Sequence, residues 1–344
     1  MKQKYIAFLL LLSTCFLFGQ NPNAAKPGSK LQQPKLVVGI VVDQMRYDYL
    51  WRYWNKFGEG GFKKLVTQGF LCKNTHYNYV PTYTAPGHTS IYTGTTPATH
   101  GIISNNWYDR ATGSVLYCVE DSLVKPVGTD NAKGRMSPKR LLTTTIADQL
   151  RLSNLKKSKT FGIALKERSS ILPAGHTANG AFWFDGSVGG FVTSSHYMTE
   201  LPVWVKNFND KKPALTYLQK GWNTLLPIAQ YTESLEDNSK YEFASTQPDM
   251  APVFPYDYTK IIEKKKFEAI AYTPYGNSIT KDLAIECLKN EQLGKDEFPD
   301  MLCVSFSSTD IIAHAYGLRA IEVEDVYLRL DKDIEEFLKT IEKE

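Results

Sequence analysis

The sequence of 344 residues contains five cysteines, and none of them belongs to a C-x-x-C pair. Cysteine-ligated zinc sites use such closely spaced pairs, so their absence argues against a metal site of this kind. Cys303 lies in the apolar run 301–306, where we expect a buried thiol. Cys72 and Cys118 could form a disulfide, and the sequence leaves this pairing open.

The chain also lacks a cluster of basic residues. Its 40 lysines and arginines are scattered among 36 acidic residues, and the formal net charge is +4. A nucleic-acid surface needs a concentrated basic patch, so we expect no nucleic-acid partner. A small anionic ligand fits this charge better. Internal repeats and low-complexity tracts are absent as well.

No apolar run reaches the ~20 residues that a membrane-spanning helix needs. The apolar run at residues 6–18 follows a lysine-containing start and precedes Gly19, which is the order found in a secretory signal. We therefore expect residues 1–19 to be a signal peptide, residues 20–35 to be a linker, and the product to be periplasmic or secreted, with no stable membrane span after signal removal. A single anchoring helix and a lipid-modified Cys15 are the alternatives.

Apolar segments without alternation predict buried parallel strands. These segments are residues 36–42, 160–165 and 301–306. Apolar residues at helical spacing mark further segments at residues 62–68, 141–152, 279–290 and 323–341. The alternation of the two kinds of segment predicts an α/β fold with a mainly parallel central sheet flanked by helices.

We expect one catalytic domain over residues 36–344. Residues 191–267 are rich in Trp, Tyr, Pro and Asn and have weak periodicity, which indicates an inserted cap or long loop. In α/β sheets, ligands bind beyond the carboxyl ends of the strands. Asp43 and Lys166 directly follow two of the predicted strands, and Asp310 follows the third within a few residues.

The segment Pro81-Thr-Tyr-Thr84-Ala-Pro-Gly-His88 has features of a helix start. A proline there costs no hydrogen bond, so Thr84 is expected at a helix amino terminus, where free N–H groups favour an anion. Its hydroxyl could attack phosphorus if a base or a metal ion stabilised the alkoxide. An ordinary N-cap threonine is the alternative.

Asp310 and His314 are four residues apart, so on a helix they share one side and could bind one metal ion. A carboxylate together with an imidazole suits zinc, although a solvated ion pair is the alternative. Lys166 and Arg168 are two residues apart, and in an extended loop they would point to the same side and could grip a phosphoryl group.

Asn105 offers an amide donor for a developing negative oxygen, although an asparagine in a loop is often turn chemistry. Three histidines adjoin glycines in loop-like sequence. These are His88, His100 and His176. We expect them to stabilise the fold or to contact the site residues, rather than to bind metal directly.

Taken in order, these segments resemble the alkaline phosphatase superfamily, specifically its branch of nucleotide pyrophosphatase/phosphodiesterases and PafA-type alkaline phosphatases. The resemblance extends from residue 36 to residue 317. The pair Lys166 and Arg168, followed by Leu-Pro-Ala-Gly-His176, is similar to the PafA-type monoesterases, whereas the phosphodiesterases lack the pair. The C/S-x-P-x-R motif of the related sulfatases is absent at Thr84.

The resemblance implies a phosphate monoester hydrolase that forms a phosphothreonine at the nucleophile Thr84 and releases inorganic phosphate. It implies two zinc ions, whose ligands would be Asp43 with Thr84 and Asp310 with His314. The residues implied to hold the phosphoryl oxygens are Asn105, Lys166 and Arg168. The implied substrates are small-molecule phosphate esters, and a monomer is favoured.

The family also has an Asp-His-Gly segment after the helix that here begins near Val323, and a later histidine. Neither occurs before Glu344. We therefore expect the catalytic domain to be incomplete at its carboxyl end and the chain as given to be nearly inactive by itself. A phosphodiesterase or nucleotide pyrophosphatase, and a catalytically dead phosphate- or metal-binding fragment, are the alternative functions.

Overall fold

The computed structural model describes residues 33–242, 251–264 and 267–344. The predicted signal peptide at 1–19 and most of the predicted linker at 20–35 lie outside these residues, as do two short parts of the predicted cap. Residues 35–344 form one compact unit. Within the described residues, no helix is both long and apolar enough to cross a bilayer.

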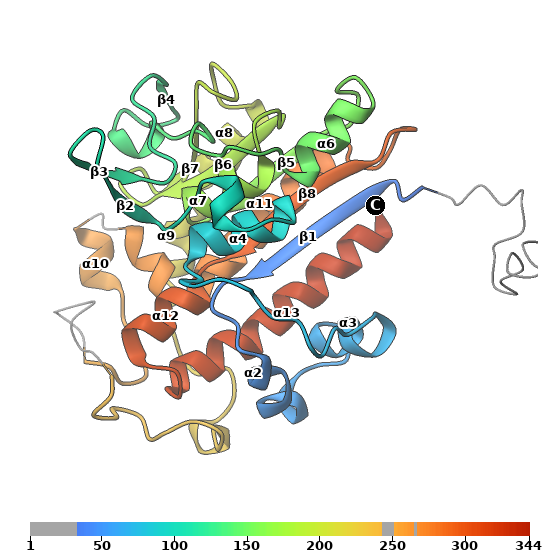
Figure 1. Ribbon diagram of the computed structural model, residues 1–344. Coiled ribbons are helices and arrows are strands. Elements are labelled where there is room, and N and C mark those ends of the chain that lie inside the picture. Colours follow the sequence, from blue (N-terminus) through green and yellow to red (C-terminus); the bar gives the residue numbers. More distant parts are fainter. Residues whose placement is uncertain (1–32, 243–250, 265–266) are drawn as a thin grey trace, which may run out of the picture. The chain divides into compact units, whose positions relative to one another are not determined.

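A six-stranded sheet lies at the centre of this unit (Figure 1), in the order β1-β8-β5-β6-β7-β4. Its strands are β1 (Leu36–Val42), β8 (Asp300–Phe306), β5 (Thr160–Ala164), β6 (Gly180–Asp185), β7 (Gly190–Ser194) and β4 (Pro126–Val127). The first four strands in this order run parallel, whereas β7 pairs antiparallel with β6 and with β4. The predicted α/β fold with a mainly parallel sheet is confirmed.

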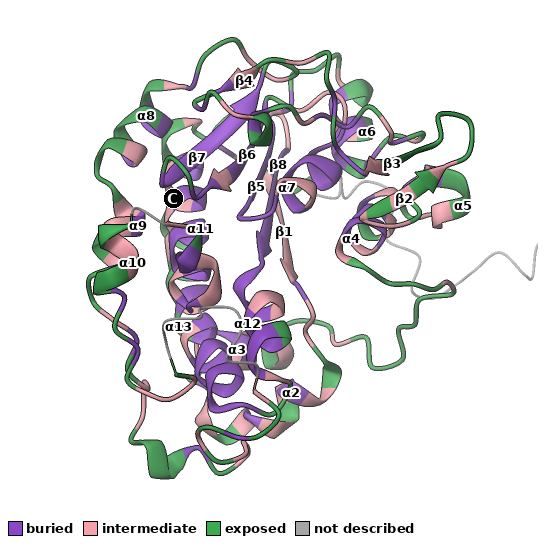
Figure 2. Cartoon of the chain, turned by 90° about the vertical axis from the view of Figure 1, so that its left-hand side faces the viewer, coloured by how far each residue is buried: buried purple, intermediate pink, exposed green. Residues whose placement is uncertain are grey.

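Helices cover both faces of the sheet (Figure 2). One face packs against α8 (Val203–Asp210), α9 (Pro213–Leu218), α11 (Tyr275–Asn290), α12 (Ser308–Tyr316) and α13 (Ile321–Lys343). The opposite face packs against α4 (Thr84–Thr93), α6 (Ile146–Ser153) and α7 (Glu167–Ala174). This two-sided cover explains why the strand sequences are apolar without alternation.

Strand β8 shows the two faces residue by residue. Leu302 and Val304 belong to the larger core under α11 and α13, whereas Met301 and Cys303 belong to a smaller cluster with Tyr92 of α4. Successive side chains of a strand point to opposite faces, and both faces of β8 are buried from solvent. The buried, unpaired Cys303 is as expected, and Cys72 and Cys118 are free thiols as well.

The remaining elements surround this framework. They are the hairpin β2 (Asn106–Asp109) and β3 (Ser114–Tyr117), the helices α2 (Tyr47–Arg52), α3 (Phe62–Gln68), α5 (Pro97–His100) and α10 (Thr259–Glu263), and the 3₁₀ turns η1 (Trp54–Lys56), η2 (Ala132–Gly134), η3 (Ile228–Gln230) and η5 (Phe267–Tyr272). The hairpin and η5 both contribute residues to the site described below.

Several predicted boundaries differ from the structure. The predicted helices at 279–290 and 323–341 are longer and extend over Tyr275–Asn290 and Ile321–Lys343. The predicted helix at 141–152 begins at Ile146, because Thr145 and Asp148 form a capping box that starts the helix after the apolar pair at 141–142. The predicted cap at 191–267 begins inside the sheet, because residues 191–194 belong to the buried strand β7. Aromatic and β-branched residues in β7 are ordinary strand formers, and their short run concealed the strand.

Candidate active site

Three polar side chains meet at the carboxyl edge of the parallel strands. Asp43 directly follows β1 and donates its N–H to the Phe306 carbonyl at 3.0 Å. Lys166 lies just after β5, and Asp310 lies on α12, which begins just after β8. Because β8 lies between β1 and β5 in the sheet, the three chain segments end side by side.

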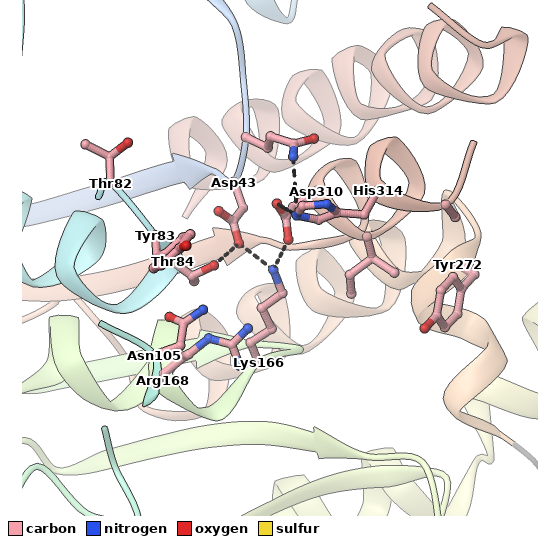
Figure 3. A pocket seen from close by; sticks show the side chains of 13 residues that line it. Asp43, Thr82, Tyr83, Thr84, Asn105, Lys166, Arg168, Tyr272, Asp310 and His314 are labelled. Carbon is pink, nitrogen blue, oxygen red and sulfur yellow. Dashed lines mark hydrogen bonds and ion pairs between the residues drawn. The ribbon is translucent and has the colours of Figure 1, made fainter. Parts of the chain in front are cut away.

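A cavity of about 650 Å³ opens at this edge (Figure 3). All seven residues that the sequence predicts for the site line it: Asp43, Thr84, Asn105, Lys166, Arg168, Asp310 and His314. They come from segments spread over more than 270 positions of the chain. The fold thus brings the whole predicted set to one place.

Thr84 is the first residue of α4, as predicted, and its hydroxyl donates to Asp43 Oδ2 at 3.3 Å. His88 lies one turn further along α4 and is buried. Its Nδ1 atom is 2.8 Å from the Thr84 carbonyl, and its Nε2 atom is 2.7 Å from Ser305 Oγ on β8. His88 therefore fixes the start of α4 to the sheet from behind the cavity.

Asn105 lies just before β2 and is held by two backbone contacts. Its Oδ1 atom accepts the Ala85 N–H at 2.9 Å, and its carbonyl accepts the Cys118 N–H at 2.9 Å. Because a backbone N–H needs an acceptor, the amide oxygen must face α4. The amide NH₂ of Asn105 then remains available as a donor toward a ligand.

Lys166 forms a buried ionic bridge between the two carboxylates. Its ammonium lies 2.7 Å from Asp43 Oδ2 and also donates to Asp310 Oδ2. Burial by itself would raise the pKa of Asp43, but Lys166, together with His88 and Arg168, outweighs burial and holds that pKa below its usual value. Asp43 is therefore ionised, and it is a weak base for the Thr84 hydroxyl.

Asp310 and His314 lie on α12 at the predicted helical spacing. His314 Nε2 is 3.2 Å from Asp310 Oδ1. The His314 side chain is 73% exposed, whereas that of Asp310 is 14% exposed, so the histidine forms the outer rim of the cavity. Gln44 Nε2 approaches the same imidazole nitrogen at 3.4 Å.

The expected extended loop at Lys166 and Arg168 is wrong. Lys166 is extended, but Arg168 lies in the first turn of α7, because the chain turns into the helix at Glu167. Both side chains still line the cavity. Arg168 Nη1 donates to the Tyr117 hydroxyl at 2.9 Å and to Glu167 Oε1 at 3.2 Å.

Several residues around the site were not predicted from the sequence. Gln44 lines the cavity and has a left-handed backbone with φ of 60°, which a non-glycine residue adopts at some cost. Tyr272 lines it from η5, a segment whose position next to α12 has no local signature. Tyr117 and Glu167 contact Arg168, and neither has a sequence signal beyond its proximity to a predicted site residue.

The cavity side chains suit zinc in kind. Carboxylate and imidazole groups are normal zinc ligands, and Asp43 is in the ionised form that a metal requires. Asp43 with Thr84 and Asp310 with His314 offer two donors each, fewer than the three protein ligands of a catalytic zinc site. Among the described residues, no group of three or more His, Cys, Asp or Glu side chains could hold a metal ion.

Comparison with known proteins finds a strong similarity to proteins named alkaline phosphatases. Alkaline phosphatase PafA of Elizabethkingia meningoseptica is 49% identical over 321 residues, which are 93% of this chain and 58% of that protein. Alkaline phosphatase PhoV of Synechococcus elongatus is 46% identical over 344 aligned residues, with 97% and 62% covered. The crystal structure of wild-type PafA matches with a TM-score of 0.87 at 49% identity, covering 90% of this chain and 60% of that one.

The chain therefore spans about three fifths of the length of these relatives. The sequence model of the type I phosphodiesterase/nucleotide pyrophosphatase family matches residues 37–344, which include every residue of the cavity described above. The extent of this match, together with the identity to PafA and PhoV, shows that the chain belongs to the type I phosphodiesterase/nucleotide pyrophosphatase family.

Proposed function

We propose that the protein is a metal-dependent phosphate monoester hydrolase in which Thr84 attacks phosphorus, forms a phosphothreonine and finally releases inorganic phosphate. One observation carries the proposal. The Thr84 hydroxyl lies at a helix amino terminus, 3.3 Å from Asp43, in the same cavity as Lys166 and Arg168. This arrangement combines a nucleophile with groups that attract an anion.

The hydroxyl of Thr84 needs help to become a nucleophile. Asp43 accepts its hydrogen bond, but the lowered pKa of Asp43 makes it too weak a base to remove the proton efficiently. Zinc ions at Asp43 with Thr84 and at Asp310 with His314 would supply the positive charge that favours the alkoxide and stabilises the leaving oxygen. The helix dipole of α4 acts in the same direction at Thr84.

The remaining cavity residues suit the transferred phosphoryl group. Lys166 provides a compact ammonium, Arg168 a planar guanidinium, and Asn105 an amide NH₂. Two cations favour the dianionic group of a monoester over the monoanionic group of a diester. Both PafA and PhoV are alkaline phosphatases by name, which supports the same choice.

Small-molecule phosphate esters are the substrates that this cavity would accept, and the apolar run at residues 6–18 supports a periplasmic or secreted location. The decisive experiment compares Thr84→Ala with Thr84→Ser in the zinc-loaded product of the complete gene. Alanine should reduce p-nitrophenyl phosphate hydrolysis by roughly 10³-fold or more, whereas serine keeps a hydroxyl and should retain activity. Substantial activity in the alanine variant would exclude Thr84 as the nucleophile.

A phosphodiesterase is the second candidate, because the matching family includes phosphodiesterases by its description. The two functions differ in the charge of the phosphoryl group. The ratio of kcat/KM for phenyl phosphate to that for bis-p-nitrophenyl phosphate separates them, and a preference for the diester would replace the monoesterase proposal.

A further inference from the structure

Arg168 is held by two residues that lie behind it. Its Nη1 atom donates to the Tyr117 hydroxyl at 2.9 Å and to Glu167 Oε1 at 3.2 Å. The Tyr117 hydroxyl donates in turn to the same Oε1 atom. The three side chains thus form a closed ring of hydrogen bonds, in which Arg168 is the member that lines the cavity.

The charges of this ring are consistent with its hydrogen bonds. Burial raises the pKa of Tyr117 and Glu167 raises it further, so the phenol keeps the proton that it donates to the carboxylate. Burial disfavours the charged form of Arg168, but Glu167 and Tyr117 outweigh burial and raise the pKa of the guanidinium. Tyr117 and Arg168 therefore both keep the protons that they donate in the ring.

Both contacts of the guanidinium fall on one nitrogen, Nη1. The described residues provide no hydrogen bond to Nη2 of Arg168, so this nitrogen is left for a ligand. A guanidinium recognises phosphoryl oxygens through its plane, and the direction of that plane depends on several rotatable bonds. A ring that fixes the plane beforehand removes an ordering cost from binding.

The hairpin that contains Tyr117 also holds Asn105, which directly precedes its first strand. Tyr117 is the last residue of β3 and pairs with Asn106, the first residue of β2. The Cys118 N–H donates to the Asn105 carbonyl at 2.9 Å. One small element therefore sets both the amide of Asn105 and, through Tyr117, the guanidinium of Arg168.

We propose that Tyr117 and Glu167 are positioning residues that hold Arg168 in the orientation in which it meets a phosphoryl dianion, and that they thereby set the preference for monoesters over diesters. This inference rests on the monoesterase function proposed above. A diester presents one negative charge fewer to the guanidinium, so loss of the orientation should affect diester hydrolysis less.

The test uses Tyr117→Phe and Glu167→Gln in the zinc-loaded product of the complete gene. Each variant keeps the shape of the side chain and removes part of the ring. We expect kcat/KM for phenyl phosphate to fall about tenfold, with a much smaller change for bis-p-nitrophenyl phosphate. Tyr108→Phe is the matched control, because Tyr108 lies on the same hairpin with 63% of its surface exposed. It should leave both rates unchanged.

A double-mutant cycle separates positioning from general support of the fold. In an Arg168→Ala background, Tyr117→Phe should cause no further loss of phenyl phosphate hydrolysis, because it acts through Arg168. A full tenfold loss in that background, or equal losses for the monoester and the diester in the single variant, would overturn the positioning role.

Competition by inorganic phosphate tests the ring even if the monoesterase proposal fails. If the unmodified protein prefers diesters, the proposed function is wrong, but the inhibition constant of phosphate still reports on Arg168. A higher inhibition constant in Tyr117→Phe that disappears in the Arg168→Ala background would support positioning. An unchanged inhibition constant in Tyr117→Phe would contradict it.

Discussion

Lys166 Nζ lies 2.7 Å from Asp43 Oδ2, and the two side chains are 9% and 10% exposed. Lys166 also bridges to Asp310, so one ammonium compensates two carboxylates that lie in a largely dry setting. Breaking a buried ion pair leaves uncompensated charge, which costs more than the loss of the contact alone. The stability of the site therefore depends on a cation between these carboxylates.

Replacing Lys166 by methionine should destabilise the metal-free protein by about 3 kcal/mol, because the largely buried carboxyl groups of Asp43 and Asp310 would lose their ion-pair partner. Added zinc should recover much of this loss by supplying positive charge. The measurement is denaturant unfolding with a chelator and then with zinc. Lys139→Met is the control, since the half-exposed Lys139 lies 3.4 Å from Asp121, and that carboxylate also accepts hydrogen bonds from Ser137 and from the Leu123 N–H, so the loss should matter little. An equal loss with and without zinc would contradict this account.

Chelation should abolish p-nitrophenyl phosphate hydrolysis by the complete protein, and zinc should restore it, because the Thr84 hydroxyl is a poor nucleophile without a cation. His314→Ala should weaken zinc binding by more than the roughly 10–100-fold that loss of an outer-shell partner costs. Zinc titration by calorimetry measures this effect directly, without relying on turnover. Unchanged zinc affinity in His314→Ala would remove His314 from the ligand set.

Glu322 should make folding stability depend on pH. It is fully buried on α13, accepts a hydrogen bond from Tyr256 at Oε1, and has no partner at Oε2 among the described residues. Burial raises its pKa to about 8 from the ordinary value of 4.5. The folded state therefore keeps a proton that the unfolded state releases, and this contribution to stability is lost as the pH rises from about 4.5 through about 8.

Glu322→Gln removes this titration. The melting temperature of the variant relative to the unmodified protein should rise steadily between pH 5 and pH 8. Glu342→Gln, at an exposed position of the same helix, provides the comparison and should show no such trend. A difference between Glu322→Gln and the unmodified protein that stays constant over this range would show that Glu322 is ionised in the fold.

Asp148 should contribute more to stability than its capping role alone suggests. Its carboxylate accepts the N–H groups of Thr145 at 3.0 Å, His176 at 3.1 Å and Thr177 at 2.7 Å. Asp148→Ala would leave these donors without their partner and should cost about 3 kcal/mol of unfolding free energy. Thr145→Ala removes one cap and should cost about 1 kcal/mol. Denaturant unfolding that ranked the two variants in the opposite order would refute this reading.

Local sequence patterns predicted much of the framework. The strands at 36–42, 160–165 and 301–306 and the helix at 62–68 agree with the structure to within a residue at each end. Buried strands covered on both faces leave an unbroken apolar run, which is visible without knowledge of the fold. The strands β4, β6 and β7 were not predicted, because β4 has only two residues and the other two strands lie in aromatic- and glycine-rich sequence that resembles loops.

The sequence predicted seven residues that line the cavity, but it did not predict the contacts that these residues make. Lys166 and Arg168 were expected to point the same way because of an extended loop. The structure instead places Arg168 on the first turn of α7, and its orientation depends on Tyr117, 51 residues earlier in the chain. A local sequence pattern contains no information about a hydrogen bond between residues far apart in the chain. The hydrogen-bonded ring of Arg168, Tyr117 and Glu167 could therefore not be predicted from the sequence.

The sequence by itself determined the strand ends that carry Asp43, Lys166 and Asp310, because apolar runs and the polar residues after them are local properties. Only the tertiary structure decided that β8, late in the sequence, lies between β1 and β5. That order brings Asp310 beside Asp43 and puts Lys166 between their carboxylates. Strand order depends on how the apolar faces of helices and strands pack against one another. This packing is a property of the whole folded chain rather than of any single segment.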